Sequence, residues 1–302
     1  MDSKCSAWLL TSVLSLAACG DQNASTASAQ ASGTAVTAAS SAPAPAPAAG
    51  EVAITKHYPA AGDKTTRERT QKFVMVTKEK GHADIEGTST YIVNRSEECL
   101  AIEGKLCSKV KVTYTANERK SAIGGSNMDR SSPTAGKTYI VEAKNGATSV
   151  TREDGAALTP EERKDVEPHY RHFAEPKDAL AALPDKVKVG DSLDDFAKAL
   201  AEQMADTDDG EKPTVTISMK VKAIRDEGGK KIVVLDVEQT NEGNDKKLGK
   251  KKSKRKGTME LRADTGLLVA SDFNDELENV FPNGVDSMKG TATEQTKVTY
   301  SF

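Results

Sequence analysis

Alternation of apolar and polar side chains is the feature that most restricts the fold of this chain of 302 residues. Residues 215–221 read Val-Thr-Ile-Ser-Met-Lys-Val, and residues 65–78 alternate in the same way. Successive side chains of a strand point to opposite faces, so a period of two predicts strands with one buried face and one exposed face. Patterns of this kind, separated by turn residues, recur over 65–152 and 214–302, and they predict antiparallel sheet in both regions.

The region between these two parts, residues 159–205, has helical patterns instead. The sequence Thr-Pro-Glu-Glu at 159–162 predicts a capping threonine, a proline in the first turn and a glutamate that completes a capping box. We expect this helix to reach about Phe173, and a second helix to cover 193–205. Three apolar side chains form one stripe on the second helix: Phe196, Leu200 and Met204.

The order of strands, two helices and strands predicts a mainly β fold of the α+β class. We expect a curved antiparallel sheet or half-barrel of about eight to ten strands, with the two central helices packed against it. One hairpin signal is especially clear, because Asn145-Gly146 lies between two β-rich runs. The globular part is expected to span residues 51–302 as a single β-rich domain.

The residues before this domain have the composition of a signal and a tether. Residues 1–18 begin with a weakly positive end and continue into an apolar stretch that is too short to span a bilayer. Residues 20–50 consist mostly of Ala, Ser, Thr and Gln, with a Pro-Ala-Pro-Ala-Pro run at 43–47. Such a segment buries too little apolar surface to offset its chain entropy, and we expect a disordered tether.

The sequence Leu16-Ala17-Ala18-Cys19 at the start of the tether resembles the lipobox of bacterial lipoproteins. The resemblance implies removal of residues 1–18 and lipidation of Cys19, including a palmitate-type acyl chain, so that residues 19–50 carry the lipid and form the tether. It also implies a lipid anchor in the cell envelope. Gly20 follows the cysteine, which by the same resemblance favours the outer membrane, with the domain in the periplasm or on the cell surface. The alternative is an ordinary secretory signal followed by an incidental cysteine.

Two further resemblances concern the folded part. The segment at 183–192, Leu-Pro-Asp-Lys-Val-Lys-Val-Gly-Asp-Ser, resembles a segment of uncharacterised bacterial lipoproteins, although Leu193 stands where an aromatic residue often follows. The order of elements resembles that of lipoproteins of the half-barrel carrier class. The first resemblance implies an envelope lipoprotein, and the second implies a carrier-like one.

Cys99 and Cys107 remain as a pair within the domain of an exported protein. A three-residue loop at 102–104 would place Gly104 in the left-handed region and set the two cysteines directly opposite each other. Directly opposed Cβ atoms lie about 4.5–5.5 Å apart, near enough for a disulfide. We therefore expect a disulfide, with two free thiols as the alternative.

A strongly basic stretch at 246–256 reads as a hairpin loop. The simplest interpretation is a solvated loop whose polar character prevents it from pairing with the edge strand of another molecule. The alternative is contact with anionic lipid head groups, to which each basic side chain contributes about 1 kcal/mol. The candidate residues for that contact are Lys250, Lys251, Lys252, Lys254 and Arg255. Nucleic acid is not expected as a partner, because the protein is predicted to be exported and no aromatic residues interleave with the basic ones.

No residue pattern points to catalysis or to a cofactor. His169 and His172 stand three positions apart and could share a helix face, but spacing specifies no third metal ligand. We expect solvated histidines there and no metal. The acidic run at 206–211 does not match a calcium-binding EF-hand loop, since Gly210 and Ile217 occupy ligand positions. The chain is therefore not expected to be an enzyme.

These observations favour a membrane-anchored, non-enzymatic envelope lipoprotein. The cup of its curved sheet would bind an apolar or amphiphilic envelope ligand, and its partners would be the membrane and that ligand. The alternative is a structural or interaction lipoprotein whose core is fully packed and whose basic loop contacts the envelope.

Overall fold

A single antiparallel sheet forms the body of the protein in a computed structural model that describes residues 50–144, 146–170, 173, 178–205, 213–245, 249–282 and 286–302. The sheet has 12 strands in the order β10-β11-β12-β13-β14-β2-β3-β4-β7-β8, with the short β5 and β6 also paired to β4. The strands of the first half are β2 (Lys64–Lys78), β3 (Ile85–Glu103), β4 (Leu106–Ile123), β5 (Ser126–Asn127), β6 (Arg130–Ser131), β7 (Thr138–Lys144) and β8 (Ala147–Arg152). Those of the second half are β10 (Thr214–Glu227), β11 (Lys230–Asp245), β12 (Gly249–Arg262), β13 (Leu268–Val280) and β14 (Ser287–Ser301). A separate two-stranded sheet joins β1 (Val52–Ala53) to β9 (Lys186–Val187).

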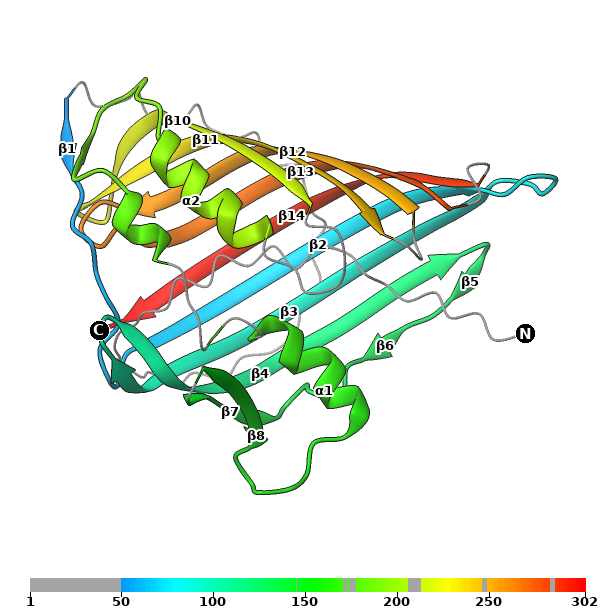
Figure 1. The fold of residues 1–302 in the computed structure, drawn as a ribbon, viewed down its shortest axis with the longest axis horizontal. Coiled ribbons are helices and arrows are strands. Elements are labelled where there is room, and N and C mark those ends of the chain that lie inside the picture. The colour runs from blue at the N-terminus through cyan, green and yellow to red at the C-terminus, as the bar shows by residue number, and fades with distance from the viewer. Residues whose placement is uncertain are drawn as a thin grey trace, which may run out of the picture.

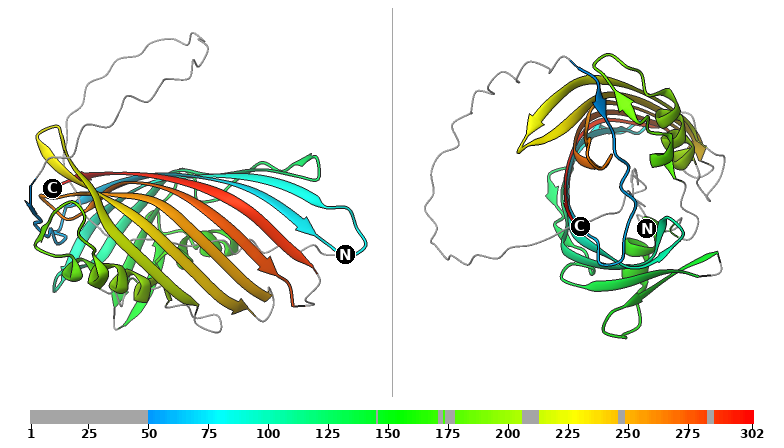
Figure 2. Two further views of the ribbon diagram at one scale, coloured as in Figure 1. Left: turned by 90° about the horizontal axis from the view of Figure 1, so that it is seen from above. Right: turned by 90° about the vertical axis from the view of Figure 1, so that its left-hand side faces the viewer.

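The sheet curls into an open half-barrel (Figure 2). Its edge strands, β10 and β8, do not pair with each other, so the barrel is open between them. The helical elements lie over the concave face of the sheet (Figure 1). They are α1 (Pro160–Val166), η1 (Glu167–His169), η2 (Ala179–Ala182) and α2 (Asp194–Ala205). The predicted fold class, a curved antiparallel sheet with two central helices, is confirmed. Among the described residues, no helix has the length and apolar character needed to cross a membrane.

Apolar side chains that point to the concave face form separate clusters there. The largest cluster lies between α2, η2 and strands β10 to β14, and it contains Phe196, Leu200, Met219, Leu235 and Met259. A second cluster lies where α1 and η1 cover β3, β4 and β7. Each buried side chain of this size contributes about 1.5–3 kcal/mol relative to exposure, so the two clusters fix the helices at separate places on the sheet.

Helix α1 begins as its sequence predicts and ends earlier. Thr159 caps the helix and Glu162 completes the capping box, since each side chain accepts a hydrogen bond from the backbone N–H of the other. The expected extension to Phe173 is wrong, because α1 stops at Val166 and continues only as the short η1. Pro168 has no N–H to donate and its ring clashes with the preceding turn, which accounts for the early end.

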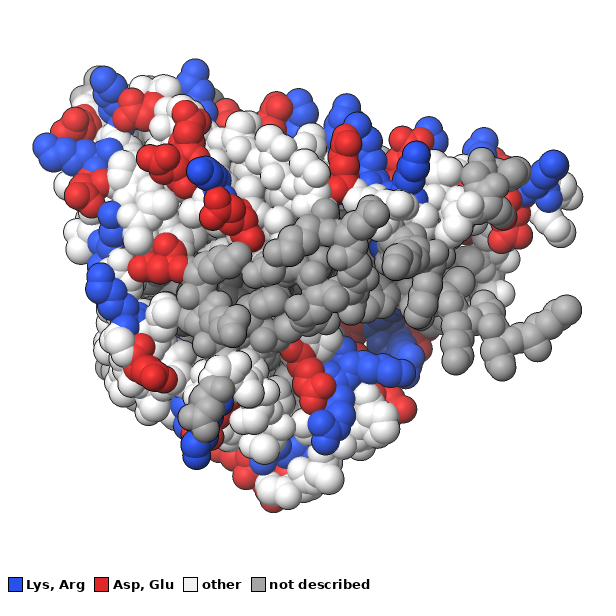
Figure 3. Space-filling view, viewed as in Figure 1, with Lys and Arg blue, Asp and Glu red and all other residues white. Residues whose placement is uncertain are grey.

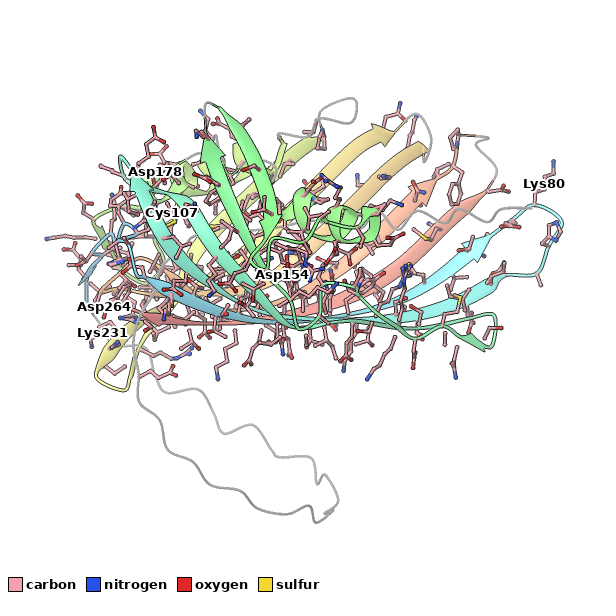
Figure 4. The ribbon with its side chains drawn as sticks, turned by 90° about the horizontal axis from the view of Figure 1, so that it is seen from below. Lys80, Cys107, Asp154, Asp178, Lys231 and Asp264 are labelled. Carbon is pink, nitrogen blue, oxygen red and sulfur yellow. A yellow bond between two sulfur atoms is a disulfide. The ribbon has the colours of Figure 1, made fainter. Side chains whose placement is uncertain are left out.

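The hairpin that carries the cysteines has a different register from the expected one. A disulfide joins Cys99 to Cys107, but Cys99 lies opposite Val110 and Cys107 lies opposite Ile102. Irregularities around Ala101 shift the pairing, and the turn is the two-residue Gly104-Lys105 with Gly104 at a φ of 64°. The disulfide therefore spans a bulged part of the hairpin. Cys107 lies at the same end of the sheet as Asp178 and Asp264, and Lys80 marks the opposite end (Figure 4).

The basic stretch is a strand and not a loop. Residues 249–256 belong to β12, which pairs along its whole length with β11 and β13. Residues 246–248 lie outside the described part of the chain. Lysine is uncommon in strands, but here alternate positions face solvent on the convex side, where charged side chains are compatible with pairing.

Candidate functional site

A cavity lies on the concave face between α2, η1 and the middle of the sheet. Its apolar wall comes from α2 and from strands β10, β11 and β12. Six side chains carry most of that wall: Leu200, Met204, Ile217, Met219, Val237 and Met259. Around this face, acidic and basic side chains are interspersed with uncharged surface (Figure 3). Polar and charged side chains also line the cavity, among them Arg69, Gln239 and Glu294, so it combines a hydrocarbon-like side with a polar side.

The free space within this cavity is small. The cavity volume is about 70 Å³. At about 10–15 Å³ for each water on this measure, the space holds on the order of five waters. A ligand with a long chain would therefore require Leu200 and Met204 to move outward with the end of α2.

The polar side of the cavity is an ion-pair network that crosses four strands, β12, β13, β14 and β2. Arg255 of β12 donates to both carboxylate oxygens of Asp275, from Nε at 2.7 Å and from Nη2 at 2.8 Å. Glu294 of β14 accepts from Arg255 at 3.0 Å and from Arg69 at 2.8 Å. The side chains of Arg255, Asp275 and Glu294 are almost completely buried. Burial would raise the pKa of Glu294, but Arg69 and Arg255 outweigh this effect and lower it.

Close packing on the same face excludes any side chain at one position of β12. A Cβ atom at Gly257 would lie 2.0 Å from the carbonyl oxygen of Asp272 and 2.8 Å from the ring of Phe273. That ring in turn stacks with the guanidinium of Arg255, 4.8 Å from its centre. Gly257 thus leaves room for the Phe273 ring next to Arg255 of the ion-pair network.

Two arginines face each other directly across β2 and β3. Arg67 pairs with Arg95 in the strand register, and both side chains belong to the cavity wall. Like charges at directly opposed positions repel each other. Burial and the charge of Arg95 lower the pKa of Arg67. Arg95 is held by Glu97 at 3.0 Å, whose carboxylate also accepts from the Tyr170 hydroxyl at 2.6 Å.

Several buried nitrogen atoms of this region have no hydrogen-bond partner among the described residues. They include Arg69 Nε, Gln71 Nε2 and His169 Nδ1. Arg69 uses Nη2 for its bonds to Glu294 and to Gln71 Oε1, which leaves Nε unused. Buried polar atoms without partners are rare in proteins, because each costs the free energy of its lost hydration. Several such atoms lie beside one cavity.

His169 is not the solvated histidine that its helical context predicts. It is half-buried at the end of η1 and its ring forms part of the cavity wall. Burial, together with the charges of Arg95 and Arg69, lowers its pKa to about 3, so that the imidazole is neutral at physiological pH. His172 lies outside the described residues. Over the described ranges, no three His, Cys, Asp or Glu side chains gather as metal ligands.

The residues proposed for contact with anionic lipid divide between the two faces of β12. Lys250, Lys252 and Lys254 are exposed on the convex face, and Lys251 is half-buried. Lys252 forms a salt bridge with Glu242. The interpretation of Arg255 as a surface residue is wrong, because Arg255 shares the inward parity of Met259 and binds Asp275. Cys19 and the acidic run at 206–211 lie outside the described residues.

The sequence interpretation missed Arg67, Arg69 and Arg95. Arg67 and Arg69 have the same parity as Phe73, which is buried on β2. An arginine at the same alternate positions of a strand as its buried apolar residues is expected to point into the protein. The sequence contains this pattern at Arg67 and Arg69. What the sequence lacks is the position of β14 beside β2, which brings Glu294 to Arg69.

Comparisons with known proteins give similarity only to solved structures. No protein-family model matches the chain, and no curated protein matches it either. A structure described as "Lipid-protein interactions in lipovitellin" aligns with a TM-score of 0.39 and 8% identity over 80% of this chain and 25% of that chain. This chain thus spans about a quarter of the lipovitellin chain. A LolA superfamily protein from Nitrosomonas europaea aligns with a TM-score of 0.14 and 9% identity over 77% and 84% of the two chains.

Proposed function

We propose that this protein is a lipid-anchored, non-enzymatic component of the bacterial cell envelope that binds an amphiphilic molecule on the concave face of its sheet. The observation that supports binding is the cavity under α2, where an apolar wall adjoins buried and incompletely bonded polar groups. Ligand sites commonly combine apolar walls with a few convergent polar groups. The lipobox-like sequence at Cys19 supports the anchor, with the outer membrane as the expected location.

The small free volume is compatible with this function if α2 acts as a cover. Only one turn of α2 reaches the cavity, through Leu200 and Met204. Phe196 and Ala197, one turn earlier, are fully buried against the sheet and would remain in place. Outward movement of the end of α2 would enlarge the cavity at the cost of the contacts that Leu200 makes in the largest cluster, while Phe196 and Ala197 hold the start of the helix on the sheet.

A tryptophan at position 204 should block this site. Met204→Trp adds volume at the cavity wall, so we expect a photoreactive long-chain alcohol to label β10, β11 and β12 at least tenfold less than in the unchanged protein, a loss equivalent to about 1.4 kcal/mol. The full chain would be labelled in envelope preparations, and the modified peptides would be identified by mass spectrometry.

Val74→Trp is the matched control, because Val74 is 55% exposed on the convex face of β2. This variant should leave the labelling of the concave strands unchanged. Absence of label from those strands in the unchanged protein would contradict the proposed function. Equal labelling of the Met204→Trp variant would place the ligand elsewhere.

The proposed anchor has its own test. Cys19→Ser removes the thiol that would carry the diacylglycerol, so incorporation of labelled palmitate should be lost completely. The measurement is radioactivity in the immunoprecipitated chain from cells grown with labelled palmitate, and Cys5→Ser serves as the control because Cys5 precedes the expected cleavage point. Retention of label in the Cys19→Ser variant would reject the assignment.

A further inference from the structure

The charges on the cavity wall are unequal. Among the described residues, four guanidinium groups and a single carboxylate form part of the wall: Arg67, Arg69, Arg95, Arg255 and Glu294. Glu294 is already bound by Arg69 and Arg255. The carboxylates of Asp275 and Glu97 each bind an arginine and do not belong to the wall itself. The cavity thus presents a surface that favours an anion.

The strand register adds a second reason to expect an anion. Arg67 and Arg95 are directly opposed, and Arg69 follows Arg67 on the same face of β2. Three guanidinium groups therefore converge on a small area of the concave face. Proteins depart from the rules of stable folding mainly at functional sites, and two directly opposed arginines are such a departure. A bound anion would reduce the repulsion and would accept several charge-assisted hydrogen bonds.

The unused hydrogen-bonding atoms lie at the same place. Arg69 Nε and His169 Nδ1 are buried and have no hydrogen-bond partner in the described part of the chain, and both side chains form part of the cavity wall. His169 is neutral, so Nδ1 can carry a proton and donate it to an oxygen atom. Arg69 offers a second donor beside it. An oxygen-rich group would satisfy both atoms.

The apolar wall begins where this polar group of residues ends. Ile217, Met219 and Val237 continue the cavity toward α2, away from Arg69 and Arg95 on β2 and β3. The strand order separates the two parts, because β12, β13 and β14 lie between β11 and β2. An occupant that fits both parts has a charged end and a hydrocarbon chain.

We propose that the cavity binds the carboxylate or phosphate head group of an anionic amphiphile between Arg69, Arg95 and His169, with the hydrocarbon chain directed beneath α2. This inference rests on the proposed binding function and specifies the ligand class. The guanidinium groups supply charge and directed donors, and the apolar wall supplies the burial of the chain. Neither part of the cavity requires a particular chain length.

The test compares two photoreactive probes of equal chain length on the full chain in envelope preparations. One is a long-chain carboxylic acid with a diazirine in the chain, and the other is the corresponding primary alcohol. We expect the acid to label the concave strands about tenfold more strongly than the alcohol, since hydrogen bonds to charged groups are stronger than neutral ones. Inorganic phosphate, which has a head group and no chain, is not expected to compete.

Arg69→Gln should remove the preference for the acid, and Arg69→Lys should restore part of it by returning the charge. Arg163→Gln is the matched control, because the side chain of Arg163 is exposed on α1 and pairs with Glu167, away from the cavity wall. The thermal unfolding midpoint of each variant would be measured alongside. The comparison of the two probes on the unchanged protein does not depend on any variant folding.

The outcomes separate this inference from the proposed function. Equal labelling of the concave strands by acid and alcohol would overturn the anionic site and leave the binding function standing. Absence of label with both probes would overturn both. Competition by inorganic phosphate alone would overturn the requirement for an amphiphile, and a full preference retained in a folded Arg69→Gln variant would overturn the role of Arg69.

Discussion

Replacing Arg255 by Met should lower the free energy of unfolding by about 3–5 kcal/mol, because the substitution leaves two buried carboxylates without their shared cation. Asp275 accepts two hydrogen bonds from Arg255, and its side chain is only 1% exposed. Glu294 would keep only Arg69 among the ion pairs described. Urea unfolding followed by circular dichroism measures this change, with the slope of the transition checked for constancy.

Two further variants show whether burial of charge is the cause. Lys254→Met changes the neighbouring residue, whose side chain is exposed on the convex face, and should alter the free energy of unfolding by no more than about 0.5 kcal/mol. Adding Asp275→Leu to the Arg255→Met variant should recover about half of the loss or more, since apolar side chains often replace buried ion pairs without cost. A loss below about 1 kcal/mol in the single variant would contradict the buried network.

Glu162→Ala should destabilise the protein by about 3 kcal/mol, because one buried carboxylate serves several partners. Glu162 is completely buried and accepts hydrogen bonds from the backbone N–H of Thr159 at 2.7 Å, and from Lys137 and Tyr139 at 2.9 Å each. The variant removes the capping box and leaves the Tyr139 hydroxyl buried without this acceptor. Urea unfolding at neutral pH measures the difference, and Glu161→Ala in the same turn is the exposed control.

The same residue makes stability depend on pH in a defined direction. Burial alone would raise the pKa of Glu162, but the hydrogen bonds from Thr159, Lys137 and Tyr139 outweigh it and lower the pKa to about 2, from a usual value of 4.5. The folded pKa is below the unfolded one, so the contribution is fully present above pH 4.5 and disappears as the pH falls toward 2. The Glu162→Ala variant should lack this part of the acid dependence. Parallel curves for the variant and the unchanged protein between pH 4.5 and 2 would contradict the assignment.

The fold was largely predictable because its determinants are local. Alternation over 65–78 and 215–221 predicted strands that are present as β2 and β10, and the capping sequence at 159–162 predicted the start of α1. The prediction of a loop for the basic stretch is wrong, because a run of charges is also compatible with a strand whose alternate side chains face solvent. Applying the same alternation through it would have placed Arg255 on the side of Met259. A charged residue indicates a solvent-exposed position only when its place in the strand alternation is also on the exposed face.

The candidate site was less predictable because it depends on strand neighbours that are distant in the sequence. Arg69 meets Glu294 only because β14 pairs with β2, and Arg255 meets both Asp275 and Glu294 across two further pairings. No local pattern encodes these pairings. His169 reached the cavity because Pro168 ended α1 early and η1 redirected the chain, whereas the expected longer helix would have left it on the surface.

The pairing of β14 with β2 has a consequence for how this protein is made. Thr65 lies opposite Tyr300, so the seam between the two halves of the sheet needs β14, which is synthesised long after β2. Each half has a hydrophobic cluster of its own, and the halves can collapse separately before they join. Until then β2 lacks one of its two neighbours, and an unpaired edge of this length invites association with other chains. The time between the emergence of β2 and the arrival of β14 is therefore the interval in which a chaperone would matter most to this protein.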